Sequence, residues 1–245
     1  MTRTLLARGM GVGLVAALCA FVFSFLVGEP QVERAIELEA QVAAAAGAAA
    51  EPEVVSRTVQ RTAGLATAAA LYGLAIGGLF GIAFAVAYGR IGSFSPRAAA
   101  GLLALGGFVA LQLAPFLKYP PNPPAVGNPD TIGRRTVLYL LMVAISVLAA
   151  LFAVSSGRRA APRLGTWNAT LLAVGGFLLL VTAAYLVLPG VDEVAAGFPA
   201  TLLWRFRLAS VGTQAVLWTT VGLLFGALTE RSLQERQPRG AAAAR

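Results

Sequence analysis

Six long apolar runs, separated by polar connectors, dominate the pattern of hydrophobic and polar positions along this chain. Each run is long enough to cross about 30 Å of hydrocarbon as an α-helix. We therefore predict an all-α, polytopic membrane protein with about six transmembrane helices, in a single helical domain over residues 1–230. The predicted spans cover about residues 5–27, 63–88, 98–117, 136–155, 166–188 and 208–229.

The connector after the first span, about residues 28–62, has a helical pattern of its own. Its stretch VERAIELEAQV alternates apolar and acidic positions as an amphipathic helix at a membrane interface does. The last residues, 231–245, are basic and end in RQPRGAAAAR, so we expect a disordered cytoplasmic tail.

Composition supports the membrane assignment. The sequence is 58% hydrophobic and 12% charged, whereas about a quarter of the residues of a soluble protein are charged. The net charge of +8 is typical of the excess of lysine and arginine on the cytoplasmic side of membrane proteins. We do not expect a nucleic-acid partner, because basic patches bind nucleic acid from a soluble surface. Membrane lipid is the expected surrounding partner.

Charged residues in the connectors predict the orientation. With the N-terminus inside, the inner segments carry 11 cations and two acids, and the outer segments carry eight cations and nine acids. The bias places both termini in the cytoplasm. The inner cations are Arg3, Arg8, Arg90, Arg97, Arg158, Arg159, Arg163, Arg231, Arg236, Arg239 and Arg245.

Small residues recur at four-residue spacing within the spans. Gly73, Gly77 and Gly81 form two overlapping G-x-x-x-G steps, and Gly222 and Gly226 repeat the spacing. Small residues let helix backbones approach closely in a membrane. These glycines are therefore predicted to pack helices, with a substrate pathway beside them as the alternative.

Few side chains in this sequence could act in catalysis. The sequence has no histidine and one cysteine, Cys19, which excludes histidine-containing zinc sites and Ser-His-Asp or Cys-His catalytic sets within this chain. We expect no enzyme activity and no cofactor. The predicted spans also carry no Asp, Glu, Lys or Arg away from their ends, which argues against a proton-coupled carrier with a carboxylate at mid-membrane.

Two outer connectors carry the candidate polar site. KYPPNPPAVGNPDTIGRR (residues 118–135) is stiffened by its prolines, and LPGVDEVAAGFPATLLWRFRLAS (residues 188–210) carries paired acids. The interpretations left open are arginine pairing, direct cation binding, and for Asp130 a helix cap. The cation candidates are Asn122, Asn128, Asp130, Asp192 and Glu193. Arg134, Arg135, Arg205 and Arg207 are predicted to pair with these acids or with the glutamates of residues 28–62.

The same stretches, with GEPQVERAI (residues 28–36) and RTLLARGM (residues 3–10), resemble the CbtA family of cobalt transporter subunits. The resemblance implies a bacterial inner-membrane protein of cobalt uptake, linked to cobalamin-related functions. It also implies a small CbtB-like partner with one span and a histidine-rich end. Two functions follow: a subunit of an uptake transporter for cobalt or a related divalent cation, and a non-transporting scaffold of a larger membrane complex. A homo-oligomer is also left open.

Overall fold

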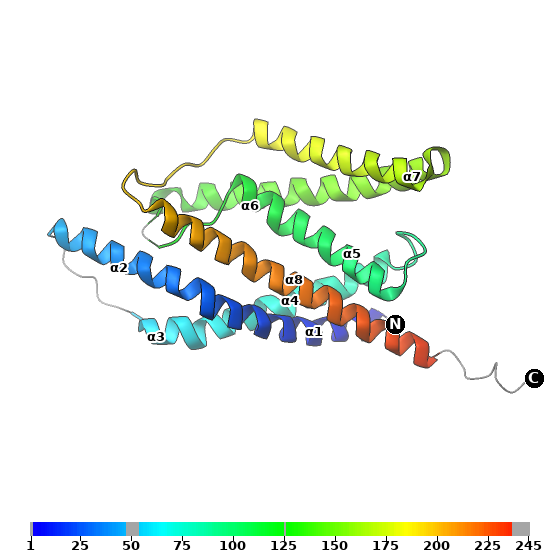
Figure 1. Ribbon diagram of the computed structural model, residues 1–245, viewed down its shortest axis with the longest axis horizontal. Coiled ribbons are helices and arrows are strands. Elements are labelled where there is room, and N and C mark those ends of the chain that lie inside the picture. Colours follow the sequence, from blue (N-terminus) through cyan, green and yellow to red (C-terminus); the bar gives the residue numbers. More distant parts are fainter. Residues whose placement is uncertain (1, 48–53, 125, 237–245) are drawn as a thin grey trace, which may run out of the picture. The chain divides into compact units, whose positions relative to one another are not determined.

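The computed structural model describes residues 2–47, 54–124 and 126–236. Within these ranges the chain is helical and contains no strand. Five helical segments are long and apolar enough to cross a membrane (Figure 1), so the fold is that of an all-α polytopic membrane protein. The segments are Thr2–Ala45, Arg57–Ala87, Pro96–Lys118, Pro129–Val187 and Ala200–Glu235.

The fourth segment contains two of the six predicted spans. Helix α7 (Ile132–Val187) has 56 residues, nearly three times the roughly 20 residues that one crossing needs. Gly165 interrupts it with φ 76° and ψ 160°, a conformation that essentially only glycine adopts. The helix folds back there as a hairpin (Figure 1). The two halves pack closely, since a Cβ on Gly157 would lie 3.0 Å from the Ala173 Cβ.

The predicted amphipathic helix follows the first span without a break. Helix α1 (Thr2–Phe23) continues through a π-helical turn, η1 (Ser24–Gly28), into α2 (Glu29–Ala45). Ala35 of α2 is fully buried. The segment expected to lie separately at the interface therefore extends the first helix, with the π-helical turn, Gly28 and Pro30 at the join.

The remaining helical segments overlap the predicted spans, and the difference is largest for α8, which begins at Ala200, eight residues before its predicted span of residues 208–229. Helix α8 continues to Arg236, so the first residues of the predicted tail are helical, and residues 237–245 lie outside the described ranges. The elements are α3 (Arg57–Val59), η2 (Gln60–Gly64), α4 (Leu65–Ala87), α5 (Pro96–Phe108), η3 (Val109–Leu113), α6 (Ala114–Lys118), η4 (Pro129–Thr131) and α8 (Ala200–Arg236).

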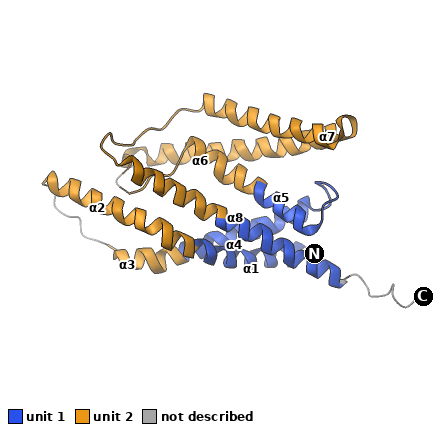
Figure 2. Ribbon diagram, viewed as in Figure 1, with its two compact units in different colours: residues 1–20, 67–105, 216–245 blue, residues 21–66, 106–215 orange. Residues whose placement is uncertain are grey.

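The chain divides into two compact units, each assembled from distant parts of the sequence (Figure 2). Unit 1 comprises residues 1–20, 67–105 and 216–245, and unit 2 comprises residues 21–66 and 106–215. The single domain predicted over residues 1–230 thus contains two clusters of contacts.

Glycines bring the backbones of α1 and α4 together in unit 1. A Cβ on Gly13 would lie 2.0 Å from the Gly73 carbonyl oxygen, and one on Gly77 would lie 2.2 Å from the Gly9 carbonyl oxygen. A Cβ on Gly81 would lie 2.5 Å from the Leu5 carbonyl oxygen. No side chain fits at these distances, so the G-x-x-x-G spacing serves backbone contact between two helices.

The C-terminal glycines pack α8 against α5 in the same unit. A Cβ on Gly222 would lie 2.6 Å from the Ala104 Cβ, and one on Gly226 would lie 3.0 Å from the Arg97 Cα. Beside these contacts, Phe225 is fully buried and packs edge-to-face against Phe80. Close backbone approach and interlocked rings therefore hold unit 1 together.

In unit 2, a buried hydroxyl compensates for an irregular turn. The Ala114 N–H bonds to Val109 across the π turn η3, and Pro115 has no N–H. The Ala110 carbonyl is thus left without a donor from its own helix, and the fully buried Ser146 hydroxyl donates to it from α7. The buried position of the Ser146 hydroxyl is therefore explained by its hydrogen bond between two helices.

Two substitutions in α1 test the glycine contact. Gly13→Ala places a methyl group against the Gly73 carbonyl, whereas Gly11 has no atom within 4 Å of its Cβ position. We expect Gly13→Ala to destabilise the purified protein by about 1–3 kcal/mol and Gly11→Ala to be neutral or slightly stabilising. Unfolding in detergent measures both. Equal stabilities would contradict the close approach of α1 and α4.

Candidate functional site

Two connectors of unit 2 hold the predicted polar residues. The proline connector (residues 119–131) joins α6 to α7, and the acidic connector (residues 188–199) joins α7 to α8. Hydrogen bonds join the start of the proline connector to the end of α7 and to the start of the acidic connector. The Lys118 Nζ donates to the Tyr185 carbonyl at 2.7 Å, and the Tyr119 hydroxyl donates to the Pro189 carbonyl at 2.8 Å. A cation at the last turn of α7 also suits the negative end of its dipole.

Asn128 begins the helical segment that leads into α7. Its Oδ1 accepts the Asp130 N–H at 2.9 Å, and its carbonyl accepts the Thr131 N–H at 3.1 Å. An asparagine side chain that accepts a backbone N–H two residues later is a typical helix start. Asn128 therefore has the capping role that the sequence analysis left open for Asp130.

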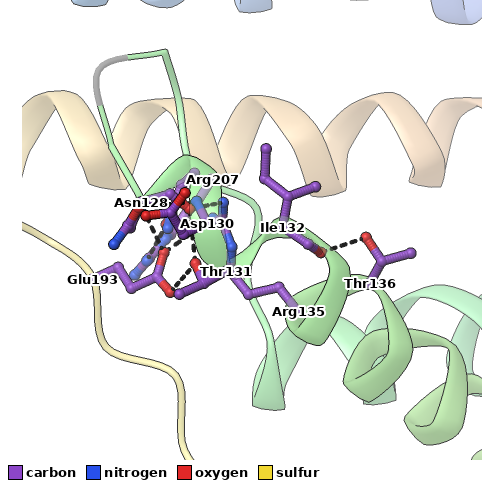
Figure 3. Close-up of polar contacts among 9 residues, drawn as sticks. Asn128, Asp130, Thr131, Ile132, Arg135, Thr136, Glu193 and Arg207 are labelled. Carbon is purple, nitrogen blue, oxygen red and sulfur yellow. Dashed lines mark hydrogen bonds and ion pairs between the residues drawn. The ribbon is translucent and has the colours of Figure 1, made fainter.

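Glu193 joins the two connectors (Figure 3). Its Oε2 accepts the Asn128 N–H at 3.0 Å and lies 3.3 Å from Arg135 Nη1. Its Oε1 accepts the Thr131 hydroxyl at 2.6 Å. One carboxylate from the acidic connector thus binds a backbone amide, a hydroxyl and a guanidinium at the start of α7. We call these four residues, Glu193, Asn128, Thr131 and Arg135, the Glu193 junction.

A glycine makes room for the arginine of this junction. Gly127 has φ 113°, in the range that favours glycine, and a Cβ there would lie 2.5 Å from Arg135 Nη1. Arg135 also donates from Nη2 to the Asn128 carbonyl at 3.3 Å. The chain from Gly127 to Arg135 is therefore folded around one guanidinium.

These contacts favour the ionised form of Glu193. The Thr131 hydrogen bond is the largest cause that lowers the pKa of the carboxyl below its ordinary value of 4.5, and partial burial opposes it. The Asn128 amide and the charges of Arg135 and Arg134 lower the pKa further. Both oxygens of the carboxylate are therefore occupied by donors at neutral pH.

Arg207 makes a second link, from α8 to the proline connector. Its Nη2 donates to Asn122 Oδ1 at 3.0 Å, and its Nε donates to the Pro121 carbonyl at 3.4 Å. A proline-stiffened backbone presents these acceptors with little conformational freedom. Thus the connector is held near its start by Arg207 and near its end by Glu193.

A cavity of about 310 Å³ lies between the two links, within unit 2. The polar residues that line it bring together two arginines and two acids, so it carries charges of both signs. They include Tyr119, Asn122, Arg135, Asp192, Glu193 and Arg207.

The predicted site residues separate into two groups. Asn122, Asn128, Glu193, Arg135 and Arg207 take part in the links, and Asp192 lines the cavity. Asp130 contributes its backbone N–H, while Arg134 and Arg205 are exposed. In the described part of the chain, no ion pair involves Asp130, Arg134 or Arg205.

The glutamates of α2 pair with arginines that the sequence did not single out. Arg57 binds Glu29, and Arg61 lies 3.2 Å from Glu33. Both glutamates and both arginines are four residues apart, which is one helical turn. This matched spacing is the signal that predicts two ion pairs between facing helices.

The geometry does not resemble a metal centre. Across the described ranges, no three His, Cys, Asp or Glu side chains gather closely enough to hold a metal ion. Glu193 is already engaged by three donors, and the cationic Arg207 lines the cavity beside Asp192. The arrangement is suited to joining connectors and to accepting a polar partner group.

Comparison with protein families decides the identity. A family model described as "Probable cobalt transporter subunit (CbtA)" matches residues 2–230. The chain belongs to the CbtA family. The resemblance found in its sequence motifs is thereby confirmed, and the fold is that of a multi-pass membrane subunit of this family. Comparisons with curated proteins and with solved structures found no match.

The lowered pKa of Glu193 predicts how the stability of this CbtA protein depends on pH. Stabilisation by a carboxylate with a depressed folded-state pKa is fully present above the unfolded pKa, and is lost as pH falls through the folded pKa. We expect the unfolding midpoint of the native chain to fall more steeply below about pH 4.5 than that of Glu193→Gln.

Asp130→Asn is the matched control, because it removes an exposed carboxylate from the same turn. It should keep the native pH profile. A native profile in Glu193→Gln would show that the Glu193 junction does not stabilise the fold.

Proposed function

We propose that this protein is the membrane-embedded subunit of a bacterial cobalt uptake system, with the cobalt ion as its substrate. The family match over residues 2–230 is the observation that carries the proposal. The fold supports it, because five helical segments, one of them a hairpin, are long and apolar enough to cross a membrane.

The orientation follows from the positions of the arginines. Arg158, Arg159 and Arg163 are exposed near the turn of the α7 hairpin. By the preference of positive charge for the inner side, this turn faces the cytoplasm, and so do both termini. The proline and acidic connectors then face the periplasm, and the membrane is the bacterial inner membrane.

The outer connectors act as a docking surface in this proposal. The described residues provide no cluster of metal ligands, and Glu193 is engaged by protein donors. Imidazole suits cobalt better than isolated carboxylates do, and this chain has no histidine. A small CbtB-like partner with a histidine-rich end therefore supplies the ligands that capture the metal, and the cavity beside Arg207 receives polar groups of that partner.

Reconstitution tests the transport function. Vesicles containing the chain and its single-span partner should accumulate labelled cobalt, and vesicles with only one of the two proteins should show little entry. Glu193→Gln should reduce entry, because it weakens the junction between the outer connectors, whereas Glu37→Gln in α2 leaves that junction intact and should have little effect.

The outcomes separate transport from the scaffold function. If the two proteins form a folded complex that admits no cobalt, the chain is a scaffold. If the chain alone transports at the full rate, the partner does not supply the metal ligands. Equal losses in Glu193→Gln and Glu37→Gln would show that the junction has no specific part in uptake.

A further inference from the structure

A second cavity, of about 200 Å³, lies within unit 1, away from both connectors. It is bounded by the first turns of α1, the end of α4 and the last turns of α8. Its polar lining consists of hydroxyl groups and one guanidinium, and apolar side chains complete the wall. The polar residues are Thr2, Thr4, Arg8, Tyr88, Thr229 and Ser232.

Two hydroxyls of α8 hold the guanidinium in place. Arg8 Nη1 donates to Thr229 Oγ1 at 3.0 Å, and Nη2 donates to Ser232 Oγ at 2.8 Å. Thr229 is only 2% exposed. Because a guanidinium is planar, two such bonds set its orientation as well as its position. Arg8 is thus a pre-oriented cation in the wall of the cavity.

The described residues of the lining carry a positive charge. Among them, Arg8 is the formally charged residue, and none is Asp or Glu. Tyr88 and the threonines add hydroxyl groups, while Leu5, Phe84 and Leu233 form an apolar side. The Phe84 ring stacks on that of Tyr88 with centroids 5.1 Å apart, so the two rings hold each other in position.

We propose that the unit 1 cavity binds a phosphate-bearing anion. A guanidinium matches the geometry of phosphate oxygens, and its charge strengthens each hydrogen bond. The apolar side suits the glycerol and first methylenes of an anionic phospholipid, while free phosphate needs only the polar side. A bound anion would contact α1 and α8 together.

Binding to the full-length protein in a neutral detergent tests the site. Short-chain phosphatidylglycerol, followed by native mass spectrometry, probes the lipid source. Inorganic phosphate, followed by equilibrium dialysis, probes the free anion. We expect Arg8→Gln to weaken binding of at least one probe about tenfold or more, the effect of losing a charge-assisted hydrogen bond. The probe that responds identifies the source.

Arg3→Gln is the matched control. Arg3 is an exposed cation in the same helix and does not line the cavity. Its removal should change the affinity less than about twofold, because exposed charges are screened by solvent and salt.

A second variant tests the cavity in the case that Arg8→Gln does not fold. Thr4 lines the cavity, and Thr4→Glu adds a carboxylate there, one helical turn before Arg8, where it competes with an anion for the guanidinium. Glutamate in the first turn of a helix is favourable, so the fold should persist and the affinity should fall severalfold by repulsion. Native affinity in Thr4→Glu, equal losses in Arg8→Gln and Arg3→Gln, or no saturable binding of either probe would overturn the proposal.

Discussion

The inability of lipid to hydrogen-bond a peptide group is the constraint on which this structure depends. Within the hydrocarbon, each backbone N–H and carbonyl needs a partner from the protein itself. The described chain satisfies this with helices, and it adds a donor where a helix is irregular. Ser146 is the direct example, since its hydroxyl binds the Ala110 carbonyl that the π turn and Pro115 leave without a partner. Conversely, contacts between backbones need no side chain, and Gly13 and Gly77 provide them.

The same constraint places charged groups at the ends of the helices. Glu193 accepts an amide, a hydroxyl and a guanidinium, and so it joins two connectors that are more than 50 residues apart in sequence. A carboxylate engaged in this way is a poor ligand for a free cation, because metal binding would require its present donors to leave. This is the physical reason for our proposal that a partner captures the metal and docks on the connectors of this CbtA protein.

Hydropathy and spacing predict most of the fold, because both act locally along the chain. The spans, the helix of residues 29–45 and the G-x-x-x-G contacts follow from such patterns. The site is less predictable, because three acids and four arginines offer many pairings of similar local sequence. Which acid meets Arg135 depends on how two distant connectors approach each other. The pairs of Arg57 and Arg61 were predictable, since their four-residue spacing matches that of Glu29 and Glu33.

Cysteine labelling tests the central claim, that the joined connectors lie on the periplasmic face of a bundle that crosses the membrane six times. Cys19 is the only cysteine, so a Cys19→Ser background can carry Asp130→Cys, Arg159→Cys or Ala196→Cys, each at an exposed position. In intact cells, an impermeant maleimide should label Asp130→Cys and Ala196→Cys, and should reach Arg159→Cys only after permeabilisation. Labelling of Arg159→Cys alone, or of only one of the other two variants, would contradict this topology and the function built on it.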